Sequence, residues 1–142
     1  MTSRRSLLAL DFAARLQAQD VSEDDGGLIA YAERLARRRE KERALTMRHL
    51  AKVARLYERA LAGECVRAVA CAPQRHGKTT LDQAAILRHL RHRPHDKINF
   101  GAYASDLAEA KMYEVRTLAP GEGIRLDPNF QTDAEWRTAQ GG

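Results

Sequence analysis

A loop that contains Gly77 and Lys78, set between two apolar segments, constrains this chain more than any other feature. Residues 72–80 read Ala-Pro-Gln-Arg-His-Gly-Lys-Thr-Thr and follow a short apolar run at residues 65–71. After the loop, apolar residues recur at helical spacing over residues 80–90. A strand, a loop and a helix in this order form the usual context of a phosphate-binding loop. The sequence therefore predicts an anion site at the start of a helix.

The residue types of the loop suit the polyphosphate of a nucleotide. Gly77 lets the anion approach the backbone, and N–H groups of the loop and of the helix start would face it. Lys78 is expected on the β- and γ-phosphates, and Thr79 is expected to give its hydroxyl to Mg²⁺. Arg75 is a second catalytic candidate beside Lys78, since an arginine near the γ-phosphate stabilises charge in the transition state. The remaining predicted nucleotide-binding residues, some of which would mainly shape the loop, are Gln74, His76 and Thr80.

The loop departs from the general pattern G-x-x-x-x-G-K-[ST] at its first position, where Ala72 replaces glycine and Pro73 follows. A Gly-Lys-Thr tripeptide also opens ordinary helices by chance. The apolar run before the loop and the helical pattern behind it favour the phosphate site.

With this variant, the loop resembles that of the large terminase subunits of tailed bacteriophages, the ATP-driven motors that package DNA into capsids. Many of them carry Pro-x-Arg-His-Gly-Lys-Ser/Thr with Ala or Pro where the first glycine would stand. Residues 97–109 and 135–142 are similar to later segments of the family's ATPase core, and residues 5–8 and 49–63 to its helical lead-in. The resemblance is strongest over residues 49–142 and weak over residues 17–47.

The resemblance implies an α/β fold, a partial P-loop NTPase core with a β-α-β unit of parallel strands, preceded by N-terminal helices. The strands would be residues 65–71 and 97–103, with a helical lead-in over residues 1–63 and an incomplete ATPase core over residues 64–142. It further implies ATP and Mg²⁺ as cofactors, and double-stranded DNA, the portal and the small terminase subunit as partners. The location implied is the cytoplasm of a bacterial host.

A second acidic motif, which P-loop ATPases use to hold the Mg²⁺ shell and orient water, does not follow the loop. Asp106 comes after an apolar run, but with Glu109 it fits a helix N-cap and its capping-box partner better. The sequence ends at Gly142, before the segments where the family continues its ATPase domain and adds a nuclease domain. We expect the N-terminal part of such a motor, binding ATP with little or no turnover alone.

Composition fits a soluble chain with one modest core, because 44% of the 142 residues are hydrophobic and 30% are charged. The sequence has no long uncharged apolar run, which excludes a transmembrane helix. Asp11 and Arg15 interrupt the apolar stretch that follows Arg4 and Arg5, and this argues against a secretory signal. The net charge of +5 is compatible with nucleic acid. The basic run at residues 34–43 has interleaved acids and reads as a solvated helix face with pairs such as Glu33 and Arg37, or alternatively as a DNA contact.

Cysteine and histidine positions give no metal pattern. Cys65 and Cys71 would share one face of a strand, too far apart to bridge, and are expected to be buried free thiols. His89, His92 and His95 stand near a helix end marked by Pro94, where they suit the helix dipole, and metal binding is the alternative.

The remaining elements are predicted from periodicity and from Gly and Pro signals. Helices are expected over residues 6–19, over residues 28–62 as one long or broken helix, and over residues 107–118, with a turn at residues 21–27. Residues 124–126 and 136–138 are candidate short antiparallel strands.

A second class of function stays open beside the nucleotide site. The N-terminal helices could form a non-catalytic interaction module in which the loop is a relic. Within the ATPase class, a helicase is the alternative to a packaging motor.

Overall fold

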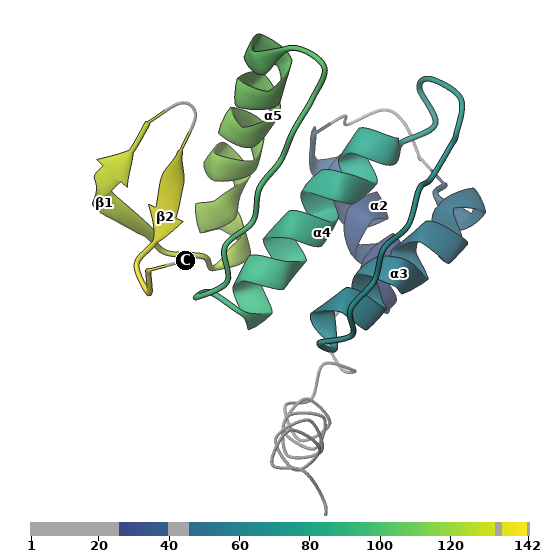
Figure 1. The fold of residues 1–142 in the computed structure, drawn as a ribbon, viewed down its shortest axis with the longest axis horizontal. Helices are drawn as coiled ribbons and strands as arrows, with labels where there is room; N and C mark the ends of the chain where they lie inside the picture. Colours follow the sequence, from purple (N-terminus) through teal and green to yellow (C-terminus); the bar gives the residue numbers. More distant parts are fainter. Residues whose placement is uncertain (1–25, 40–45, 133–134, 142) are drawn as a thin grey trace, which may run out of the picture. The chain divides into compact units, whose positions relative to one another are not determined.

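A computed structural model describes residues 26–39, 46–132 and 135–141, and within them helices prevail (Figure 1). The chain divides into two compact units, one that extends to Lys78 and one that begins at Thr79. The helix predicted for residues 6–19 and nearly all of the turn at residues 21–27 lie outside the described residues.

The described part of the first unit holds two helices and a short 3-10 turn. Helix α2 (Gly27–Arg39) contacts helix α3 (Ala51–Leu61), which follows the 3-10 helix η1 (Arg48–Leu50). The buried residues of α2 recur at i, i+3, i+4 and i+7, the spacing of one helix face. They are Leu28, Tyr31, Ala32 and Leu35. The helix expected over residues 28–62 is broken, because α2 ends at Arg39 and α3 begins only at Ala51.

Two carboxylates connect the elements of the first unit through backbone N–H groups. Glu58 Oε1 on α3 accepts a hydrogen bond from the N–H of Leu28 at 3.0 Å. Because the first turn of α2 contains no acidic residue, Glu58 supplies the negative charge that favours a helix N-terminus. Glu33 Oε1 accepts from the N–H of Met47 at 2.8 Å, so this carboxylate bonds to the start of η1 rather than forming the expected pair with Arg37.

The second unit contains helix α4 (Lys78–His92) from Thr79 onward and helix α5 (Ser105–Leu118), which is followed by the 3-10 helix η2 (Ala119–Glu122). Every residue of α4 from Gln83 to Leu90 except His89 is buried. The two helices share polar contacts, since Gln83 Nε2 donates to Glu114 Oε2 at 2.8 Å. Both helices were predicted near these positions.

A two-stranded antiparallel hairpin completes the second unit. Strand β1 (Leu126–Gln131) pairs antiparallel with strand β2 (Trp136–Thr138). The second strand lies where it was predicted, whereas the first shares only Leu126 with the predicted residues 124–126. The hydroxyl of Thr138 donates to the carbonyl of Pro94 at 2.7 Å, and His95 Nδ1 donates to the carbonyl of Gln140 at 2.6 Å. These bonds hold the end of the hairpin against the segment that leaves α4.

The predicted parallel β-α-β core is wrong. Across the described residues, the only sheet is the β1–β2 hairpin, and residues 65–71 and 97–103 lie outside any strand. The exposed fractions of two side chains show that these runs have no cover. Val69 in the first run is 93% exposed, and Tyr103 in the second run is 96% exposed. Parallel strands are stable when both faces are covered and when neighbours pair with their edges, and two short runs have neither.

Two further expectations fail. Cys65 and Cys71 are free thiols but exposed, since no sheet covers the segment that carries them. The N-cap of α5 is Ala104, without a side-chain cap, and Asp106 lies in the first helical turn, where its carboxylate still suits the dipole.

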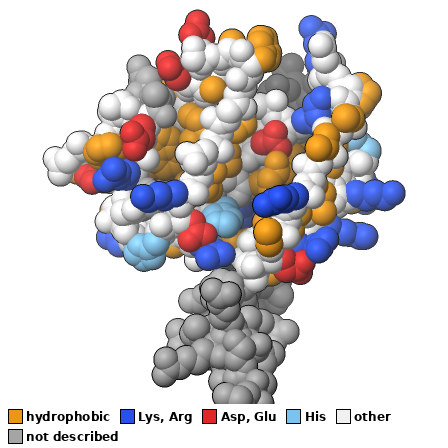
Figure 2. All heavy atoms as spheres, in the orientation of Figure 1, with side chains coloured by type: hydrophobic (Ala, Val, Ile, Leu, Met, Phe, Trp, Pro, Cys, Tyr) orange, Lys and Arg blue, Asp and Glu red, His pale blue; other side chains and the backbone are white. Residues whose placement is uncertain are grey.

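None of the described helices is long and apolar enough to cross a membrane. On the face shown in Figure 2, Lys and Arg side chains are interspersed with acidic, apolar and uncharged ones.

The three candidate histidines do not form a metal cluster in the described region. His89 instead contacts Asp96 at 2.8 Å, and His95 contacts the Gln140 carbonyl.

Candidate phosphate-binding loop

The loop at residues 72–77 leads directly into α4, whose first residue is Lys78. Thr79 and Thr80 follow in the first turn, so the loop stands before a helix as predicted. The first turn of α4 contains no acidic residue. The positive end of its dipole therefore meets no acidic side chain from within that turn.

Backbone dihedrals in the loop alternate in sign. Arg75 has φ of 61° and Gly77 has φ of 81°, whereas Gln74, His76 and Lys78 have negative φ. Successive residues with φ of opposite sign are a feature of the nest, a backbone arrangement that binds anions. Arg75 is the one described residue other than glycine with a positive φ, and this conformation costs a residue with a side chain about 1–2 kcal/mol. Such strain marks functional loops.

Three carbonyl oxygens of the loop accept hydrogen bonds from side chains. Lys78 Nζ donates to the carbonyl of Ala72, which closes the loop on itself. His76 Nδ1 donates to the carbonyl of Gln74 at 2.8 Å, and this bond requires the proton on Nδ1. The third donor is His49 Nε2, 2.9 Å from the carbonyl of His76. These bonds tie the loop to itself and to His49.

His49 belongs to η1 and is a part of the site that the sequence interpretation missed. Its ring meets the ring of His76 edge-on, with centroids 5.7 Å apart and planes at 86°. The contact joins residues 27 positions apart, so no local spacing signals it. His49 links the start of the α3 segment to the loop backbone.

Each predicted site residue is open enough to meet a ligand. Gln74, Arg75, His76 and Thr79 are exposed, and the half-buried members are Gly77, Lys78 and Thr80. The structure brings Lys78, Gln74 and His76 into one hydrogen-bonded loop.

The donor set fits a phosphate better than it fits a bare metal ion. Residues 72–80 offer Mg²⁺ the neutral side-chain oxygens of Gln74, Thr79 and Thr80 and no carboxylate, and Mg²⁺ commonly keeps several waters and takes phosphate oxygens as ligands. Over the described ranges, no group of three or more His, Cys, Asp or Glu side chains is placed to hold a metal.

No protein-family model matches this chain, and comparisons with curated proteins and with solved structures find no match either.

Proposed function

We propose that residues 72–80 bind the polyphosphate of ATP together with Mg²⁺. The observation that carries the proposal is the alternation of φ at Arg75 and Gly77 directly before a helix that begins at Lys78. This combination offers converging N–H groups and a positive helix end to one anion. Since no family model matches, the proposal depends on the loop itself.

In the proposed complex, the ammonium of Lys78 leaves the carbonyl of Ala72 and binds the β- and γ-phosphates. A bond between two charged groups is stronger than a bond to a neutral carbonyl, which favours this exchange. Thr79 gives its hydroxyl to Mg²⁺, and Arg75 extends its guanidinium to the γ-phosphate. The bound Mg²⁺ would neutralise charge on the phosphates.

We assign binding rather than turnover to this segment, because the contacts described for the loop include no carboxylate that would orient a water. In this proposal the chain is a nucleotide-binding part of a large terminase subunit. DNA, the portal and the small terminase subunit are proposed partners through the resemblance of the loop alone.

The test is thermal unfolding of the whole chain with Mg²⁺ and a non-hydrolysable ATP analogue. A ligand present at 100 times its Kd stabilises the folded state by about 2.7 kcal/mol, and this corresponds to a rise in Tm of roughly 5–15 °C. Lys78→Ala is expected to abolish the rise. Lys52→Ala, which removes an exposed lysine of α3, is the matched control and keeps it.

A rise that survives in Lys78→Ala would refute the assignment of the site. No rise in a wild-type chain shown to be folded by circular dichroism would refute nucleotide binding and favour the helical interaction module.

A further inference from the structure

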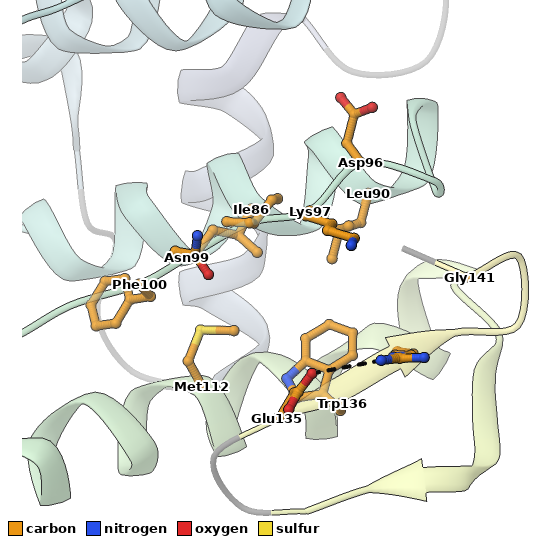
Figure 3. A pocket seen from close by; sticks show the side chains of 12 residues that line it. Ile86, Leu90, Asp96, Lys97, Asn99, Phe100, Met112, Glu135, Trp136 and Gly141 are labelled. Atoms are coloured by element: carbon orange, nitrogen blue, oxygen red, sulfur yellow. Dashed lines mark ion pairs between the residues drawn. The ribbon is translucent and has the colours of Figure 1, made fainter.

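The second unit contains a pocket of about 340 Å³ (Figure 3). One wall is the extended segment at residues 96–100, the other is β2, and α4 and α5 contribute side chains. The volume lies within the range of small-molecule sites, roughly 300–1,000 Å³. Its apolar lining residues, apart from Trp136, are Ile86, Leu90, Ile98, Phe100 and Met112.

Trp136 presents an unsatisfied hydrogen-bond donor in this lining. Its indole Nε1 is buried and has no acceptor among the described residues. A buried N–H without a partner costs roughly the desolvation free energy of that group, so native structures usually provide an acceptor. Because this atom has almost no accessible surface, it is the rest of the indole ring that meets the pocket.

The charges around the pocket leave one cation uncompensated. Asp96 Oδ2 is held by Arg93 at 2.9 Å and by His89 at 2.8 Å. Glu135 Oε1 lies 3.9 Å from Arg137 Nη2, and a dashed line marks this ion pair in Figure 3. Lys97 is exposed at the rim and pairs with no acid in the described part of the chain. Figure 3 shows Lys97 on the segment opposite the Trp136 ring.

One end of the pocket is fixed before any ligand arrives. The bonds from Thr138 to Pro94 and from His95 to Gln140 join the two walls beyond Lys97. A preformed wall lowers the ordering cost of binding.

We propose that this pocket binds a small apolar carboxylate. The apolar body lies on the lining of α4 and α5 and on the Trp136 ring, and the carboxylate pairs with Lys97. The same chemistry is offered by a free N-acyl amino acid and by the C-terminal residue of a peptide.

The chain contains a single tryptophan, so its indole N–H gives one assignable signal in a ¹⁵N-correlated NMR spectrum. Titration with N-acetyl-leucine is expected to shift this signal, because the ligand would contact the ring, and to saturate with an affinity on the order of millimolar. N-acetyl-leucine amide, which lacks the carboxylate, should bind at least about threefold more weakly. A tetrapeptide ending in leucine, with a free or an amidated C-terminus, distinguishes the peptide source from the free acid.

Lys97→Gln should weaken binding of N-acetyl-leucine about threefold and remove the preference over the amide. Lys52→Gln is the control and should change neither. An indole signal that does not move at 20 mM ligand in the folded chain overturns the proposal. Equal binding of acid and amide to the wild type also overturns it. Lys78→Ala should leave the titration unchanged, so failure of the ATP site would not affect this result.

Discussion

His49→Phe removes one hydrogen bond to the proposed phosphate loop and keeps a ring of similar size in place. In the wild type, His49 Nε2 donates to the carbonyl of His76 at 2.9 Å, and the bond is exposed. A net contribution near the lower part of the usual range, about 0.5–1 kcal/mol, is therefore appropriate. If this bond holds the loop in its anion-binding shape, its loss weakens ATP binding by about two- to fivefold.

Isothermal titration calorimetry with Mg²⁺ and a non-hydrolysable ATP analogue measures this change directly. Global stability should fall little, because the ring is on the surface, so Tm without ligand is a control for folding. Lys52→Ala in α3 is the control for substitution of an exposed residue nearby. A Kd for His49→Phe equal to that of the wild type would show that His49 does not organise the loop.

Three further substitutions test other parts of the structure. Gly77→Ala places a side chain at φ of 81° and should cost about 1–2 kcal/mol in thermal or denaturant unfolding, together with most of the ATP binding; an unchanged Tm would contradict the left-handed backbone. Glu58→Ala should lower the free energy of unfolding by about 1–2 kcal/mol, since the N–H of Leu28 loses its acceptor, and Glu58→Gln should recover part of that loss; equal stability of both variants would argue against a capping role. Thr138→Val removes a hydroxyl from a residue that is only 1% exposed and leaves the Pro94 carbonyl without its donor, so chemical denaturation should show about 1–2 kcal/mol of destabilisation. Thr138→Ser keeps the hydroxyl and should avoid this loss, and unchanged stability of Thr138→Val would show that the bond contributes nothing.

The elements that depend on local signals could be predicted from the sequence. Apolar spacing after the loop predicted a helix, and α4 occupies that position from Lys78 to His92. The helix predicted over residues 107–118 corresponds to α5, which ends at Leu118. Its end was predictable because Pro120 and Gly121 follow. The loop residues of the candidate site follow from the same local pattern.

The elements that depend on distant partners could not be predicted. Residues 65–71 and 97–103 are apolar enough for strands, but a strand forms only where another strand pairs with it, and periodicity carries no information about that partner. The burial assigned to Cys65 and Cys71 failed with the sheet. The contact of His49 with His76 and the pocket at Trp136 likewise join residues far apart in the sequence.

Because both thiols are exposed, one chain can form disulfide bonds with two other chains. Cys65 and Cys71 are six residues apart in a segment outside any helix or strand. Fully extended, such a segment separates them by about 20 Å, beyond the reach of one disulfide. A protein with one accessible thiol stops at a dimer when it oxidises, whereas two accessible thiols that cannot meet each other permit linear growth. In air-oxidised samples without reductant, we therefore expect a ladder of disulfide-linked oligomers on non-reducing gels, which either single Cys→Ser variant should truncate at the dimer.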